Sequence, residues 1–371
     1  MRVVVWTGPA WETWGPGSLL TGTGGSEAAA AYLSRELARL GHEVEVAGQV
    51  TPCEDQGVRY VDYREYLHGD SPVTPARKVE CDVFVSSRDL RAVDALRPDA
   101  RLKVLWSHDV HCGPDPHAVM SRYDVVLCLS DWALHLARRF YPHVDPAKFA
   151  RTRNGIDTSL YRSEPRREGF QVVYSSSLDR GLDKLLDYWP AIREMRPDAE
   201  LHVYYGLDTW EKMVERTRDV VGAAQVQVFR TRLSNMASQG VAYHGRVGQA
   251  ELAAAWLRAS AWLYPTNFCE TSCITAMEAQ AAGVPCVCTR LGALPETARF
   301  AYLVDPPNTR EGYRAEFLEH AERVARLTKT CGFATDILVE RKEEGREWAL
   351  RELGWGGVAG QWDELFRARL A

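Results

Sequence analysis

Two glutamates eight positions apart, Glu270 and Glu278, occur in a stretch that has the pattern of a loop followed by a helix. The residues around Glu278 are almost all alanine, isoleucine or methionine, so we expect a buried helix that begins near Thr271 or Ser272 and ends at Gly283. A carboxylate inside such a helix is costly unless a polar group binds it. The pattern therefore favours a ligand-binding role for Glu278, with Glu270 in the loop just before the helix.

The start of this helix also suits an anion. We expect the backbone N–H groups of Thr271, Ser272 and Cys273 to lack partners within the helix, and the helix dipole adds to their attraction for phosphate. A loop carboxylate for sugar hydroxyls, helix-start amides for a diphosphate and an inner carboxylate for a ribose diol together describe a nucleotide-sugar site. The alternative is a buried helix of an ordinary α/β domain that carries one glutamate at its edge.

The segment from Glu270 through the letters EAQAAGVP to RLGALPE resembles the signature of family 4 retaining glycosyltransferases, which have the GT-B fold. The resemblance implies an enzyme, a hexosyltransferase that moves a sugar from a nucleoside-diphosphate sugar to an acceptor with retained anomeric configuration. It assigns Glu270, as a catalytic residue, to the hydroxyls of the transferred sugar. It assigns Glu278 to the ribose of the donor.

Three further stretches carry the same resemblance. The letters NGID, which begin at Asn154, resemble the hinge motif at which the chain enters the second domain. The letters HGRV resemble a stretch in which the backbone around Arg246 and Val247 frames the nucleotide base. The letters YSSSLDRGL resemble the family's basic loop, in which Arg180 would bind the diphosphate.

This basic loop departs from the family pattern. Most members carry an earlier arginine and then Lys-Gly, whereas this chain has serines at 175–177 and one certain base, Arg180, with Lys184 a turn further along. Charge compensation of the diphosphate therefore depends on fewer residues. A non-catalytic nucleotide-sugar-binding protein is one alternative to the enzyme, and a GT-B sugar-nucleotide epimerase is another.

The first part of the chain predicts a strand, a glycine-rich turn at Gly24 and Gly25, and a helix from Glu27 to Leu40. Glycines at such a turn let the backbone approach a phosphate or a sugar closely, so we predict that Gly24 and Gly25 contact the donor. The turn lacks the GxGxxG pattern of dinucleotide-binding domains. The alternative is that these glycines only turn the chain.

His108 follows a predicted strand, RLKVLWS, and precedes Asp109. Sites in doubly wound sheets lie at the carboxyl ends of strands, where this histidine is expected. The resemblance implies a histidine near the transferred sugar at the matching place, so His108 is our second catalytic candidate. The alternative is a histidine that pairs with Asp109 for structure alone.

Alternating strands and helices along 371 residues predict an α/β protein of two Rossmann-like, doubly wound parallel-sheet domains. The resemblance to GT-B proteins implies that they face a cleft. We expect an acceptor-side domain over residues 1–153 and a donor-side domain over 154–371. The last helix, about 357–371, is expected to pack back on the first domain, as it commonly does in GT-B proteins.

Composition limits the partners. A net charge of −5 and a pI near 6.1 argue against nucleic acid as the main ligand. We expect a nucleotide sugar and an unidentified acceptor, which could be a glycan, a lipid or a small molecule. The basic segment Arg138–Arg153 could contact a membrane surface or be an ordinary solvated connector.

The nine cysteines are scattered without a CxxC pair, which predicts reduced thiols and a cytoplasmic protein. A peripheral membrane contact stays open because of the basic segment. No stretch reaches the ~20 apolar residues of a membrane span. No Asp-x-Asp motif occurs, and cysteines 269, 273, 286 and 288 have a spacing that suits zinc poorly. We therefore expect no metal and no cofactor besides the donor substrate.

Overall fold

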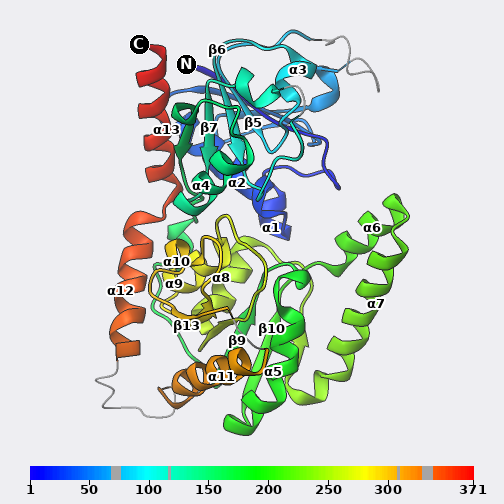
Figure 1. Ribbon diagram of the computed structural model, residues 1–371, viewed down its shortest axis with the longest axis vertical. Coiled ribbons are helices and arrows are strands. Elements are labelled where there is room, and N and C mark those ends of the chain that lie inside the picture. The colour runs from blue at the N-terminus through cyan, green and yellow to red at the C-terminus, as the bar shows by residue number, and fades with distance from the viewer. Residues whose placement is uncertain (68–76, 116–117, 307–309, 328–336) are drawn as a thin grey trace. The chain divides into compact units, whose positions relative to one another are not determined.

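The computed structural model describes residues 1–67, 77–115, 118–306, 310–327 and 337–371 (Figure 1). The chain divides into two compact units. The first comprises Met1–Leu19, Thr23–Gly155 and Gly354–Ala371, and the second comprises Leu20–Gly22 and Ile156–Leu353. Both units are α/β and are built on parallel strands, which confirms the predicted fold class.

The first unit contains an eight-stranded sheet of order β3-β4-β2-β1-β5-β6-β7-β8. Its strands are β1 (Arg2–Gly8), β2 (Glu43–Gly48), β3 (Cys53–Asp55), β4 (Val58–Asp62), β5 (Glu80–Ser87), β6 (Asp99–Ser107), β7 (Val125–Cys128) and β8 (Phe149–Arg151). Every pairing is parallel except β3 with β4. The central strand β1 buries three consecutive valines, as expected for a strand covered on both faces.

The helices of the first unit include one from the far end of the sequence. They are α2 (Gly25–Arg39), α3 (Ala92–Leu96), α4 (Asp131–Phe140) and α13 (Trp355–Leu370), and the short α1 (Ser18–Thr21) begins in this unit and ends in the other. Helix α13 packs against α2 and β6. Its Trp362 is buried against Trp106, and the Trp362 indole N–H donates to the Thr152 hydroxyl over 2.7 Å.

The second unit contains two three-stranded parallel sheets, β11-β10-β9 and β12-β13-β14. The strands are β9 (Phe170–Tyr174), β10 (Ala199–Val203), β11 (Val241–Tyr243), β12 (Trp262–Tyr264), β13 (Cys286–Thr289) and β14 (Tyr302–Val304). A parallel bridge between Val172 and Ala261 joins β9 to the start of β12. The combined order therefore reverses between β9 and β12, which is the topological switch point where α/β sheets bind ligands.

The second unit's helices are α5 (Leu182–Met195), α6 (Leu207–Thr217), α7 (Val220–Asn235), α8 (Gln249–Arg258), α9 (Ile274–Ala281), α10 (Leu294–Thr297), α11 (Arg310–Leu327) and α12 (Ile337–Glu352). Helices α6 and α7, which come between β10 and β11 in the sequence, lie side by side at the right of Figure 1. Helix α9 is buried from Thr275 to Ala281, as its apolar composition predicted. Across the ranges described above, no helix is long and apolar enough to cross a bilayer.

Two helix starts differ from those predicted. Helix α9 begins at Ile274, and the Glu270 carbonyl accepts the Ala293 N–H over 2.7 Å, which ties the loop before the helix to residue 293. Thr271 and Ser272 therefore remain in the loop, and Cys273 is the cap. Helix α2 begins at Gly25, so the predicted glycine turn is already the cap and first turn of a helix.

Candidate functional site

The loops that follow β9 and β12 bring two predicted site residues together, although they lie 90 positions apart in the chain. The Arg180 guanidinium donates to both carboxylate oxygens of Glu270, over 3.1 and 3.3 Å. The Tyr264 hydroxyl donates to the same carboxylate over 2.7 Å. The ring of Phe268 lies 4.2 Å from the guanidinium carbon of Arg180. Glu270 is thus held from two sides, with its side chain only 3% exposed.

Burial and the opposite charge of the partner act in opposite directions on the pKa values of Glu270 and Arg180. Burial raises the pKa of Glu270, while the Arg180 charge and the hydrogen bonds from Tyr264 and Arg180 act against that rise. Burial alone would lower the pKa of Arg180, but the Glu270 carboxylate outweighs it and the net direction is upward. Arg180 therefore stays cationic, and it compensates a carboxylate that would otherwise be costly to bury.

Two glycines allow the backbone to come this close. Gly181 has φ +108°, and a Cβ there would lie 2.7 Å from the Pro265 carbonyl oxygen. Gly292 has φ +58°, and a Cβ there would lie 2.6 Å from the Glu270 carbonyl oxygen. Both positions combine a left-handed conformation with contact to the loop that carries Glu270, so both require glycine.

The start of α9 lies beside the loop after β9. Since the helix begins at Ile274, its free N–H groups begin with Ile274 and Thr275, one turn later than the predicted Thr271, Ser272 and Cys273. The Thr275 hydroxyl lies 3.3 Å from the Ser175 hydroxyl and 3.2 Å from that of Ser176. The sequence did not single out these hydroxyls as binding groups.

Glu278 lies inside α9, with 5% of the residue exposed. Burial raises the pKa of its carboxyl group to about 7, and the Trp256 indole N–H opposes the rise. This indole is itself buried and makes no hydrogen bond of normal geometry with the residues that the structure describes, so it only partly offsets the burial. A ligand that donated hydrogen bonds to Glu278 would stabilise its ionised form.

Arg246 and Val247 lie in the loop between β11 and α8, at the carboxyl end of β11. A Cβ at Gly206, in the loop after β10, would lie 3.3 Å from both the Cβ and the Nε of Arg246. The two loops are therefore in contact at the same edge of the sheet. The role of Arg246 and Val247 in framing a base stays a prediction.

The remaining candidates lie in the first unit. His108 follows β6 with its ring 4.3 Å from that of Trp106, and its pKa is lowered to about 3 by burial and then by the charge of Arg88. The histidine is therefore neutral at physiological pH. Asp109, its predicted alternative partner, is held by two N–H groups of Arg88, each at 2.9 Å.

Gly24 caps α2 and Gly25 is the first residue of that helix. The Arg88 guanidinium also donates to the Ser26 hydroxyl, over 3.2 Å, and so links the start of α2 to the end of β6. Sequence reasoning missed Arg88, whose only signal is structural: it has φ +68°, a conformation that is unusual for arginine. It also missed Tyr264 and Phe268, which looked like an ordinary strand residue and a loop residue.

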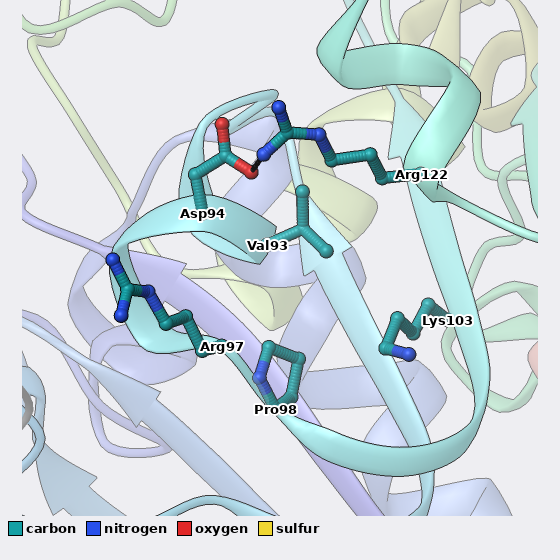
Figure 2. Close-up of a pocket in the computed structure, with 6 residues that line it drawn as sticks. All are labelled: Val93, Asp94, Arg97, Pro98, Lys103 and Arg122. Carbon is teal, nitrogen blue, oxygen red and sulfur yellow. Dashed lines mark hydrogen bonds and ion pairs between the residues drawn. The ribbon is translucent and has the colours of Figure 1, made fainter.

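The first unit also has a surface hollow of about 570 Å³, shown in Figure 2. It is lined by Val93, Asp94, Arg97, Pro98, Lys103 and Arg122, and Arg122 pairs with Asp94. None of the predicted site residues lines it. Among the residues that the structure describes, no cluster of histidine, cysteine and acidic side chains could hold a metal ion.

Comparison with known proteins points to one family. Residues 169–322 match the family described as Glycosyl transferases group 1. The phosphatidyl-myo-inositol mannosyltransferase of Mycobacterium tuberculosis is 26% identical over 239 residues, which cover 61% of this chain. The alignment covers 56% of that relative's own length.

Solved structures share the fold over nearly the whole chain. A glycosyltransferase from Rickettsia africae has a TM-score of 0.70 at 13% identity, over 100% of this chain and 98% of that one. The pneumococcal O-GlcNAc transferase GtfA, solved with UDP and GlcNAc, has a TM-score of 0.67 at 10% identity, over 100% and 99%. The resemblance that the motifs predicted is confirmed: residues 169–322 match the group 1 glycosyltransferases, and the solved structures show that the chain has the GT-B fold.

Proposed function

We propose that this protein transfers a sugar from a nucleoside-diphosphate sugar to an acceptor, with retained anomeric configuration and without a metal ion. The observation that carries the proposal is the Arg180–Glu270–Tyr264 arrangement at the β9/β12 switch point, inside the segment that matches the family. The switch point of a doubly wound sheet is where a nucleotide is expected to bind.

The proposed chemistry follows from the charges. As the sugar leaves the diphosphate, negative charge develops on the phosphate oxygens, and fixed donors at that place lower the barrier. Arg180 is fixed by Glu270 and Phe268, and the first amides of α9 lie in the same unit. These groups would compensate the leaving group in the role that a metal ion has in other transferases.

Glu270 would orient the hydroxyls of the transferred sugar, and Glu278 would hold the ribose diol. Holding both ends of the donor in one geometry converts a flexible ligand into an oriented one, which is a large part of the rate gain. His108, Gly24 and Gly25 stay predictions as contributors from the first unit. A neutral His108 can accept or donate one hydrogen bond to an uncharged sugar hydroxyl.

The first test is ligand-induced thermal stabilisation with uridine, guanosine, adenosine and thymidine diphosphate sugars and their free diphosphates. GDP-mannose is included because the curated relatives are named mannosyltransferases. A ligand at a hundred times its dissociation constant adds about 2.7 kcal/mol to the free energy of unfolding. A panel in which no compound raises the transition would overturn the proposal.

The second test separates an enzyme from a binder. The stabilising donor is incubated with candidate acceptors, which include phosphatidylinositol because of the relatives' name, and release of nucleoside diphosphate is measured. A transferase releases diphosphate only when an acceptor is present, and NMR of the product reports its anomeric configuration. A donor that is bound and recovered unchanged with every acceptor would indicate the non-catalytic alternative.

A further inference from the structure

The surface hollow of the first unit lies beside a part of β6 that β7 does not cover. Strand β7 begins at Val125, which pairs with Val104, so β6 has no β7 neighbour before Val104. The connection from α3 to β6 and the short turn that ends at Arg122 contribute residues to the space beside it. The hollow therefore follows from where the strands begin.

Positive charge predominates in this hollow. Arg97, Lys103 and Arg122 line it together with one carboxylate, that of Asp94, which pairs with Arg122. The carboxylate of Asp124 accepts the backbone N–H of Lys103 over 2.7 Å. Among the residues that the structure describes, no carboxylate forms an ion pair with Arg97 or Lys103. Two cations are therefore available to a ligand, in a protein whose net charge is −5.

The cations lie on opposite sides of an apolar floor. Figure 2 shows Arg97 on one side of the hollow, Lys103 and Arg122 on the other, and Val93 and Pro98 between them. Both residues of the floor are buried. The volume of about 570 Å³ falls in the range of sites that bind small molecules, roughly 300–1,000 Å³. An anionic group on a compact organic body would contact both the cations and the floor.

The backbone at Arg97 also departs from the common pattern. Arg97 ends α3 with φ +45°, in the left-handed region that arginine rarely adopts. Glycine or asparagine would suit this helix end better, but neither carries a cation. Costly conformations of this kind are concentrated at ligand sites. A guanidinium and an ammonium group are the side chains that most often bind phosphate.

We infer that this hollow binds a phosphate group, carried either by a small soluble molecule or by a lipid headgroup. A phosphomonoester has a charge of about −1.5 to −2 at neutral pH, which matches the two available cations. The inference goes beyond the proposed function and does not depend on it. Lys103 precedes His108 by five positions of extended chain, about 16 Å, so the hollow is separate from the carboxyl end of β6.

The test follows the amide signals of Val93 and Arg122 by NMR in the full-length protein. Both residues line the hollow, so their signals report on it and not on phosphate bound in the second unit. Inorganic phosphate and glycerol 3-phosphate probe a soluble ligand. Vesicles of phosphatidylcholine with and without phosphatidic acid, sedimented with the protein, probe a lipid headgroup. We expect the amide signals to shift, or sedimentation to require phosphatidic acid.

The deciding variant is Arg97→Gln/Lys103→Gln. It should weaken the observed binding about tenfold or more, because each cation contributes a charged contact to phosphate. The control, Arg91→Gln/Arg139→Gln, removes the same charge from two exposed residues of the first unit that do not line the hollow. The control should bind like wild type.

Each outcome supports or overturns the inference. Saturating amide shifts identify a soluble ligand, and sedimentation alone identifies a lipid headgroup, provided that the Arg97→Gln/Lys103→Gln variant loses the effect. Absence of binding in both experiments, binding that this variant retains, or an equal loss in the control overturns the inference. Ligand-free melting curves show which variants are folded. If the double variant is not, Arg97→Gln decides alone, because Arg97 is exposed.

Discussion

At the scale of single residues, Glu278 holds its carboxyl group inside α9, where burial raises the pKa from 4.5 to about 7. An unfolded chain releases this proton near pH 4.5, so between the two values the folded protein binds a proton that the unfolded chain does not. The free energy of unfolding therefore falls as the pH rises from about 4.5 to 7, and this contribution is constant above that range. The gap corresponds to about 3 kcal/mol.

Glu278→Gln removes the group that must be desolvated. We expect the variant to unfold with nearly wild-type free energy at pH 5 and to exceed wild type by up to about 3 kcal/mol at pH 8. The same variant should bind the donor more weakly, because the amide cannot accept both ribose hydroxyls as a carboxylate does. Denaturant titrations at both pH values and donor titrations measure these effects.

The control for this prediction is Glu215→Gln, on the exposed face of α6. It should change neither the pH dependence nor donor binding. If the free energy of unfolding of Glu278→Gln depended on pH as steeply as that of wild type, the buried Glu278 carboxyl group would not be the cause of the pH dependence.

Arg180→Ala leaves the Glu270 carboxylate buried without its cation. We expect a loss of about 3 kcal/mol of stability, toward the low end for broken buried pairs because the Arg180 side chain is 37% exposed. Turnover should fall as well, since Arg180 is proposed to stabilise the leaving diphosphate. Thermal denaturation and a diphosphate-release assay measure the two effects.

A double-mutant cycle completes this test. Adding Glu270→Gln to Arg180→Ala should restore most of the stability but none of the turnover, because the stranded charge is gone while both functional groups are lost. Additive losses of stability in the double variant would show that the two side chains do not interact.

The sequence predicted Glu270, Glu278 and Arg180 as site residues, because their spacing and neighbours form local patterns. It could not predict that Arg180 pairs with Glu270, since this contact joins loops 90 positions apart and depends on the strand order. Tyr264 was missed for the same reason. Its hydroxyl bonds the carboxylate only because the loop after β12 turns back on the strand.

At the scale of elements, the conformation of the turn between β9 and α5 depends on Gly181. Gly181→Ala would place a methyl group 2.7 Å from the Pro265 carbonyl and force a left-handed conformation on alanine. We expect a loss of about 3 kcal/mol of stability and weaker donor binding, because the loop that carries Arg180 must move. Denaturant titration and the donor thermal shift measure the two effects.

Gly169→Ala is the matched control in the same unit. Its φ is +61°, but a Cβ there meets nothing within 4 Å, so it tests backbone conformation alone. It should cost about 1 kcal/mol and leave donor binding unchanged. Equal losses in the two variants would mean that the contact with Pro265 contributes nothing.

Apolar periodicity was enough to predict which segments are helices and which are strands. It did not predict the first residues of helices α2 and α9. The loop before α9 is tied to residue 293 by the Glu270–Ala293 backbone bond, and Gly292 permits that approach. Residues 292 and 293 lie about twenty positions downstream, outside any local window. A local pattern does not predict a tertiary contact of this kind.

At the scale of the whole molecule, the core of the first unit contains residues from both ends of the chain. Trp362→Ala in α13 would open a cavity beside Trp106 and leave the Thr152 hydroxyl without its donor. We expect a loss of about 3–5 kcal/mol in the first unit. Amide hydrogen exchange should show lower protection in β6 and α2, and unchanged protection in β9 and α9.

Trp11→Ala is the control, because this tryptophan is 56% exposed. Its protection pattern should match wild type. Equal loss of protection in both units of Trp362→Ala would show that they unfold as a single cooperative body, contrary to this expectation.

The placement of α13 also has a consequence for biosynthesis. Nearly all of the second unit is one continuous run, Ile156–Leu353, whereas the first unit needs residues 354–371 to cover Trp106 and its neighbours. During translation the strands of the first sheet are therefore made before the second unit, whereas α13, which completes their core, is made after it. Until α13 is made, the apolar side chains around Trp106 lack this cover, and we expect chaperones to bind them.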